Sequence, residues 1–186
     1  MADPIFAERR LAQTYDPLDP DRSDLNAYAS LARDTSGMGM PYNPAARFRR
    51  TQAQRVDQLL SWKRSDQAFF AAGACHVLAW VAAEQYASAG FGIAGLRKHR
   101  EPYVSHVIIS NGRWAFDHDG WTPLPELLRA TAEYEPDPSW ELLPLTSTLQ
   151  DFCAAHHHRM PEQYAHDPLP RARRYLQQRP RPPEVV

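Results

Sequence analysis

Three residues of the sequence, Cys75, His106 and Asp117, have the side chains that a thiol-based acyl-transfer site requires. Cys75 opens an alanine-rich, apolar segment that predicts a buried helix. At the N-terminus of a helix the amide dipoles favour a thiolate and lower the pKa of a cysteine. Taken alone, a cysteine in such a segment is commonly a small core residue, and histidines also occur in ordinary strands. Chemistry therefore requires that the fold bring the three side chains together.

The dipeptide Asn111-Gly112 predicts a tight β-hairpin turn between two apolar runs. If these two residues form the turn, directly opposed residues lie equally far before and after it. His106 lies five residues before Asn111, and Asp117 lies five residues after Gly112. The two are therefore predicted to face each other, with Cβ atoms roughly 4.5–5.5 Å apart. The carboxylate can then hold one ring nitrogen, which leaves the other for a nucleophile.

The two faces of this hairpin differ in character. One face is bulky and apolar and includes Val107 and Ile109, whereas the other carries His106, Ile108 and Asp117. If the face with His106 and Asp117 is covered, the covering element must leave room for these two polar side chains. The alanine-rich helix that begins near Cys75 is the predicted cover for the face with the histidine.

The order and spacing of these residues resemble the core of the transglutaminase-like branch of the papain-fold cysteine enzymes, a group that includes the arylamine N-acetyltransferases. In that core a G-x-C-x-x-x-A helix start is followed by a strand with a histidine and by a hairpin to a W-x-x-D strand. The matching positions are Gly73, Cys75, Ala79, His106, Trp114 and Asp117. The resemblance covers about residues 65–122. Many members carry an aromatic residue just after the cysteine, where this chain has His76.

The resemblance implies an α+β fold with a papain-like core, in which the cysteine-bearing helix packs on an antiparallel sheet and further helices follow at the C-terminus. It implies a peptidase, amidase, deamidase or acyltransferase that acts on a protein, peptide or other amide. Cys75 is then the nucleophile, His106 the general base and acid, and Asp117 the group that orients the imidazole. The Cys75 N–H supplies one oxyanion donor, and Gln67 or Trp62 supplies the second.

Two other interpretations remain open. The chain could keep this fold as a non-catalytic protein-binding module, with its Pro-rich arms as the interacting segments. An effector or toxin that modifies a protein of a host or rival is a biological role for the same thiol chemistry. An occluded Cys75, or a sulfur far from the His106 ring, favours the binding module.

The composition of the chain argues against several classes of protein. The net charge is −1, from 21 basic and 22 acidic residues, which argues against a nucleic-acid-binding protein. No apolar run is long enough to span a bilayer and no signal peptide is recognised, so no membrane partner is expected. With two cysteines a disulfide scaffold is excluded and a reduced, cytoplasmic location is the default, although secretion by a route without a signal remains open. No cofactor or metal site is predicted.

Proline placement and apolar periodicity predict the organisation of the chain. We expect an irregular arm over residues 1–45, one catalytic domain over 46–178 and a loose tail over 179–186. Helices are predicted at about residues 24–33, 51–64, 66–87, 125–132, 146–157 and 171–178, with strands at 90–97, 103–109 and 113–116 and a strand or turn at 140–145. A start of the helix over 66–87 only near Gly73 is left open, because a glycine there marks a tight entry.

The remaining histidines have other predicted roles. The run His156-His157-His158 reads either as a solvated helix end or as a metal site, and the first is favoured because adjacent residues do not share one helix face. His118 is expected on the opposite face from Asp117 if the strand continues. His76 points about 100° away from Cys75 on a helix, which favours a pocket-wall or surface position over the role of base.

Overall fold

The computed structural model describes residues 41–136 and 139–179 of the 186-residue chain. In these ranges the helices are η1 (Ala45–Phe48), α3 (Gln52–Val56), α4 (Gln58–Trp62), α5 (Asp66–Ala71), α6 (Cys75–Tyr86), η2 (Ala87–Ala89), α7 (Leu124–Tyr134), α8 (Leu149–His156), η3 (Pro161–Gln163) and α9 (Pro168–Gln177). The strands are β1 (Gly92–Lys98), β2 (Val104–Ser110), β3 (Trp114–Asp117), β4 (Gly120–Pro123) and β5 (Trp140–Pro144).

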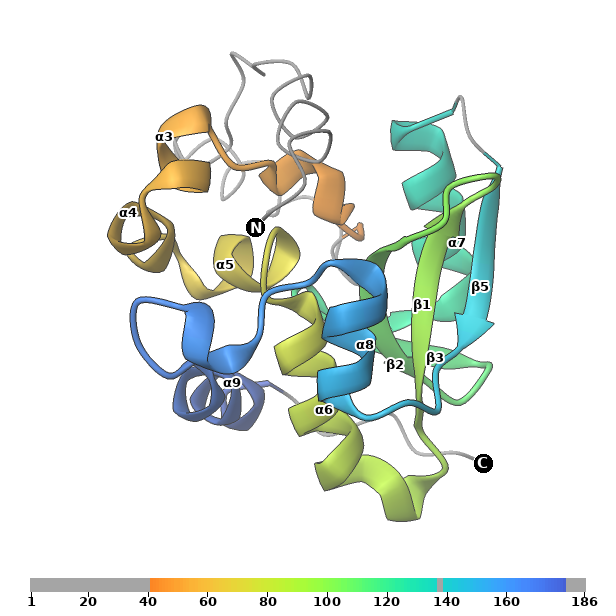
Figure 1. The fold of residues 1–186 in the computed structure, drawn as a ribbon. Helices are drawn as coiled ribbons and strands as arrows, with labels where there is room; N and C mark the ends of the chain where they lie inside the picture. The colour runs from red at the N-terminus through yellow and green to blue at the C-terminus, as the bar shows by residue number, and fades with distance from the viewer. Residues whose placement is uncertain (1–40, 137–138, 180–186) are drawn as a thin grey trace, which may run out of the picture.

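The five strands form one antiparallel sheet in the order β4-β3-β2-β1-β5 (Figure 1). The long helix α6, which begins at Cys75, contacts β1, β2 and β3 and is flanked by α5, α8 and α9. The predicted α+β class is therefore confirmed: a helix that carries a buried cysteine packs on an antiparallel sheet, and further helices follow at the C-terminus.

The predicted covering of the two sheet faces is wrong. The apolar side of α6 packs against the face of β2 that carries Val107 and Ile109. The face with Ile108 packs instead against α7. Cys75 therefore approaches His106 from the first turn of α6, at the end of the sheet where β2 begins and β3 ends. It does not lie over the face of the strand that carries His106.

The hairpin turn lies one residue later than predicted. Ser110 pairs with Ala115, which makes residues 112–113 the tip. Moving a two-residue turn by one position shifts the pairing by two residues, and because side chains alternate with a period of two they keep their faces. His106 and Asp117 therefore share a face as predicted, but they are diagonal neighbours and not directly opposed.

The predicted helix over residues 66–87 is two helices, and Gly73 is the reason. Gly73 has φ +135°, a conformation that residues with a Cβ rarely adopt. Its carbonyl accepts a hydrogen bond from the Tyr164 hydroxyl at 2.5 Å, which ties the break to the C-terminal part of the chain. The break makes Cys75 the first residue of α6, so its side chain projects from a helix N-terminus.

Other elements depart from prediction only locally. The helix over residues 51–64 is broken at Asp57, whose carboxylate caps α4. α8 is capped by Thr148 and not by a residue before it. The region at 140–145 forms a strand, and β4 is a strand that the pattern did not indicate. The helix predicted at residues 24–33 lies outside the described residues, and the boundaries of the arm, domain and tail stay predictions.

The space beside Gly95 in β1 is filled by neighbouring side chains. A Cβ at this position would lie 2.9 Å from both γ-carbons of Val104 and 3.2 Å from Leu145, whereas a Cβ at Gly92 would meet nothing within 4 Å. We expect Gly95→Ala to lower the free energy of unfolding by about 1–3 kcal/mol, because the β-branched partner cannot move aside without strain. Gly92→Ala is the matched control in the same strand. Equal denaturant midpoints for the two variants would contradict the packing described.

Candidate active site

His106 and Asp117 meet at the end of the sheet. Nε2 of His106 lies 2.8 Å from Oδ2 of Asp117, and both side chains are buried. The diagonal register brings the long imidazole to the carboxylate. A β-bulge contributes, because Leu96 pairs with His106 while the next residue of β1 pairs with Val104, so β2 contains an extra residue just before the histidine. Bulges of this kind re-aim a side chain at the end of a strand.

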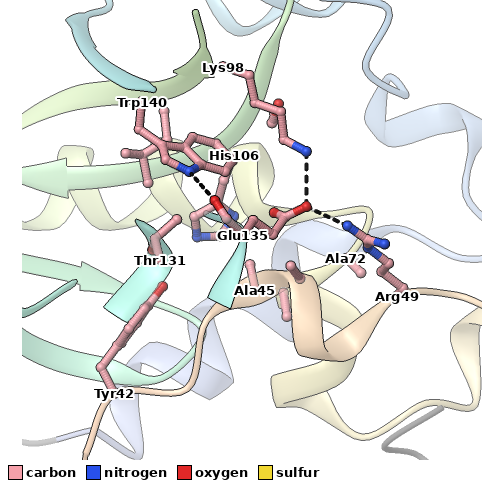
Figure 2. Close-up of a pocket in the computed structure, with 13 residues that line it drawn as sticks. Tyr42, Ala45, Arg49, Ala72, Lys98, His106, Thr131, Glu135 and Trp140 are labelled. Carbon is pink, nitrogen blue, oxygen red and sulfur yellow. Dashed lines mark hydrogen bonds and ion pairs between the residues drawn. The ribbon is translucent and has the colours of Figure 1, made fainter. Parts of the chain in front are cut away.

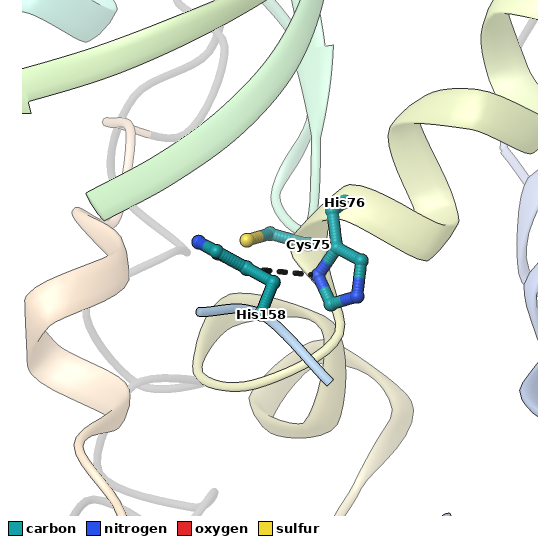
Figure 3. A group of neighbouring side chains, drawn as sticks. All are labelled: Cys75, His76 and His158. Carbon is teal, nitrogen blue, oxygen red and sulfur yellow. Dashed lines mark hydrogen bonds between the residues drawn. The ribbon is translucent and has the colours of Figure 1, made fainter. Parts of the chain in front are cut away.

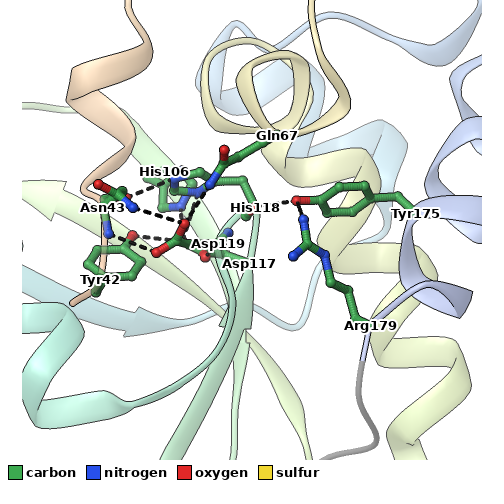
Figure 4. Close-up of polar contacts among 9 residues, drawn as sticks. All are labelled: Tyr42, Asn43, Gln67, His106, Asp117, His118, Asp119, Tyr175 and Arg179. Atoms are coloured by element: carbon green, nitrogen blue, oxygen red, sulfur yellow. Dashed lines mark hydrogen bonds and ion pairs between the residues drawn. The ribbon is translucent and has the colours of Figure 1, made fainter. Parts of the chain in front are cut away.

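The Asp117 carboxylate is held by four groups, which Figure 4 shows. Besides His106, the Tyr42 hydroxyl donates to Oδ2 at 2.7 Å, the Asp119 N–H donates to Oδ1 at 2.9 Å, and Nδ1 of His118 lies 3.1 Å from Oδ2. Burial alone would raise the pKa of Asp117, but His118 and His106 hold it well below its usual range. Burial and the charge of Asp117 raise the pKa of Tyr42, so its hydroxyl stays a donor.

Cys75 occupies the N-terminus of α6 with only 4% of its surface exposed. The residue before it, Ala74, offers no side chain to cap the helix, so the first amides of α6 are left for another acceptor. Burial alone would raise the pKa of the Cys75 thiol. Hydrogen bonding to His106 and His76 outweighs it and holds the pKa well below the usual range.

His106 connects the thiol to the carboxylate. Burial alone would lower its pKa, but hydrogen bonds to Asp117 and Cys75 raise it to about 10. Because Nε2 is engaged by Asp117, Nδ1 is the ring nitrogen left for the thiol. Among the described residues this buried Nδ1 has no partner within hydrogen-bond geometry. The charges favour a thiolate and an imidazolium at neutral pH.

A second pair of histidines borders Cys75 on another side (Figure 3). Nδ1 of His76 lies 3.1 Å from Nδ1 of His158. One ring nitrogen of each histidine and the Cys75 sulfur lie within 4.8 Å of one another. Burial alone would lower the pKa of His76, but Cys153 and Cys75 raise it to about 9. Burial lowers the pKa of His158. At neutral pH the shared proton therefore belongs to His76, and His158 accepts it.

These contacts remove the surface alternative for His76 and show that the condition attached to the His118 prediction is not met. His76 is fully buried and interacts with Cys75, so it is not a surface residue. His118 does not point away from Asp117, because β3 ends there and the following turn brings the ring back to the carboxylate.

The interpretation of the histidine run as a solvated helix end holds only for His157, which is exposed. His157 has φ 55° and ends α8 in the left-handed conformation, so the chain reverses. His158 then turns inward, and its Nε2 donates to the Val104 carbonyl at 3.0 Å.

The two side chains predicted as oxyanion donors have other neighbours. The Gln67 amide donates to Oδ1 of Asp119 at 2.5 Å, within the network of Figure 4. Trp62 packs edge-to-face against Phe69, with the guanidinium of Arg171 over its ring. The oxyanion role of either residue stays a prediction.

A cavity of about 210 Å³ opens beside His106 (Figure 2). Arg49 and Lys98 both pair with Oε1 of Glu135 on its wall. Because two cations share one carboxylate, this trio carries a net positive charge. Ala72, three residues before the nucleophile candidate, also lines the cavity. The cavity therefore reaches the His106 ring and the segment just before Cys75.

Two groups among the described residues could hold a metal ion. One is Cys75 with His76 and His158, and the other is His106 with Asp117 and His118. Comparison of the chain with protein-family models, curated proteins and solved structures found no match. Within the described ranges, no helix is both long enough and apolar enough to cross a membrane.

Sequence reasoning missed three residues of the site: Tyr42, His118 and His158. The Asp119-Gly120 dipeptide is a turn signal directly after Asp117, and a strand that ends there leaves His118 free to turn back. Tyr42 lies 75 residues from Asp117, and His158 lies 82 residues from His76. No local pattern connects residues so far apart.

The ionisation of Cys75 tests the electrostatics of the site. We expect the ultraviolet absorbance of the thiolate, taken as wild type minus Cys75→Ala, to persist well below the usual cysteine pKa of about 8.5. His106→Gln removes the main hydrogen bond that lowers this pKa, so the midpoint should rise by about one to three units. Cys153→Ala serves as the control for the second thiol. A wild-type midpoint near 8.5 would refute the arrangement.

Proposed function

We propose that the chain is a cysteine-dependent acyl-transfer enzyme in which Cys75 is the nucleophile, His106 the general base and acid, and Asp117 the orienting group. The single observation that carries this proposal is the position of His106 between a buried thiol and a buried carboxylate. The resemblance of residues 65–122 to the transglutaminase-like, papain-fold enzymes supports it.

The chemistry follows from the protonation states. The Cys75 thiolate attacks an amide or thioester carbonyl carbon, which forms an S–C bond and a tetrahedral oxyanion. The Cys75 N–H donates to that oxyanion in this proposal, which the absence of a side-chain cap at the start of α6 supports. The intermediate collapses as the bond to the leaving group breaks, and His106 gives its proton to the leaving amine or thiol. Water or an amine then attacks the acyl-thioester, and His106 accepts the proton of the attacking group. The second tetrahedral intermediate collapses as the S–C bond breaks, which releases the acyl product and restores the Cys75 thiolate.

Asp117 acts through His106 and does not touch the reacting atoms. Its carboxylate fixes the ring so that Nδ1 faces the thiol, and its charge stabilises the imidazolium. Tyr42 and His118 keep that carboxylate ionised and oriented. We propose a protein, peptide or other amide as the substrate, with access past the cavity beside His106.

A non-catalytic binding module is the second candidate function, and one observation favours it. Only 4% of the Cys75 surface is exposed, so a substrate must displace or pass neighbouring groups to reach the sulfur. The two functions differ in outcome, because a binding module forms no acyl-enzyme.

Trapping of the acyl-enzyme tests the proposal. The full chain is incubated with a panel of peptide amides and peptide thioesters, and the acyl adduct is followed by intact mass. We expect an adduct on wild type, none on Cys75→Ala, and acylation about 10²–10⁴-fold slower in His106→Gln, because the ring no longer polarises the thiol or protonates the leaving group.

The matched control is His99→Gln, which replaces an exposed histidine that pairs with Glu141 at the end of β1. It should acylate at the wild-type rate. Folded wild type that forms no adduct with any member of the panel, or equal rates in the two histidine variants, would favour the binding module.

A further inference from the structure

We propose that Cys75, His76 and His158 form a Zn²⁺ site, separate from the group that contains His106 and Asp117. The three side chains come from the start of α6 and from the turn after α8, and their ligand atoms lie within 4.8 Å of one another (Figure 3). His76 is fully buried, and His158 is half-buried and forms the accessible side of the group.

The hydrogen bonds of the two histidines fix which nitrogens face each other. Nε2 of His76 lies 2.8 Å from the Arg159 carbonyl, and Nε2 of His158 lies 3.0 Å from the Val104 carbonyl. A carbonyl oxygen only accepts, so both Nε2 atoms carry a proton. In neutral rings both Nδ1 atoms are then bare acceptors, yet they lie 3.1 Å apart. Two facing lone pairs need a cation between them, which is either a proton or a metal ion.

The same hydrogen bonds are those of metal-ligating histidines. Such residues almost always donate the second ring N–H to a carboxylate, a backbone carbonyl or water, which fixes the tautomer and makes the ligating nitrogen more basic. Both histidines meet this condition with main-chain carbonyls. Their orientation is therefore set by the backbone and does not depend on the ion.

The distances and donor types favour zinc. With Zn–N bonds of about 2.0–2.1 Å and Zn–S bonds of about 2.3 Å, ligand atoms around a tetrahedral ion lie roughly 3.3–3.6 Å apart. The two Nδ1 atoms, 3.1 Å apart, are close to this spacing, and the sulfur, which lies within 4.8 Å, must move inward by up to about 1.2 Å. A thiolate with two imidazoles excludes Mg²⁺ and Ca²⁺, which prefer oxygen ligands. Three protein ligands leave the fourth position for water.

In the other candidate group the carboxylate already has close partners without an ion, although Nδ1 of His106 and Nδ1 of His118 have no hydrogen-bond partner among the described residues. The Asp117 carboxylate lies at 2.8 and 3.1 Å from the nitrogens of His106 and His118 and accepts from Tyr42. An ion there would have to break these contacts. An ion between His76, His158 and the sulfur would displace only the proton that the two rings share.

Zinc at this position bonds the sulfur that the proposed acyl-transfer chemistry needs. Binding consumes the thiolate and releases the proton shared by the two histidines. The site therefore acts as a reversible inhibitory site for the thiol, and this consequence, unlike the site itself, rests on the proposed function.

Equilibrium dialysis of the reduced, chelator-treated full chain against buffered Zn²⁺ tests the site. Metal analysis should give one bound zinc for wild type, and Cys75→Ala and His158→Gln should weaken binding by about 100-fold. His157→Asn, which changes the exposed neighbour in the same histidine run, should bind as wild type does. Co²⁺ should give a thiolate charge-transfer band in wild type that Cys75→Ala lacks.

His106→Gln separates the two proposals. It should retain one zinc per chain although it loses acylation, which is measured in chelator without metal. Absence of zinc binding by wild type, or equal affinities of His158→Gln and His157→Asn, would overturn the metal site and would leave the acylation result unaffected.

Discussion

The hydrogen bond between His106 and Asp117 is the interaction on which the site depends. A carboxylate that is 2% exposed is costly to keep ionised without partners. The Asp117 carboxylate is hydrogen-bonded to His106, Tyr42 and the Asp119 N–H, and Nδ1 of His118 lies 3.1 Å from it. The buried negative charge keeps the His106 ring protonated, and the protonated ring in turn stabilises a thiolate in surroundings that would otherwise disfavour one.

Several features of the fold place these charges. Gly73 breaks the chain so that α6 starts at the cysteine, and Tyr164 fixes that break through the Gly73 carbonyl. The bulge before His106 and the end of β3 at Asp117 bring the other two groups to the same end of the sheet. The site is thus assembled from the ends of three elements, while the interiors of those elements build the core.

The contact between His106 and Asp117 could be predicted from the sequence, because alternation along a strand assigns side chains to faces even when the turn is misplaced by one residue. The helix start near Cys75 could also be predicted, because a glycine lies two residues before it. The face of the sheet that α6 covers could not be predicted, because it depends on α7 packing against the other face. Tyr42 and His158 were not identifiable, because their contacts join distant segments and follow no periodic pattern.

Side-chain ¹⁵N NMR of His106, assigned by comparison with His106→Gln, tests the central claim most directly. The account predicts that both ring nitrogens stay protonated through neutral pH and that the ring loses its proton only near pH 10, with the midpoint lower in Asp117→Asn. A ring that titrates near the ordinary histidine value of about 6.5, or one that Asp117→Asn leaves unchanged, would contradict it.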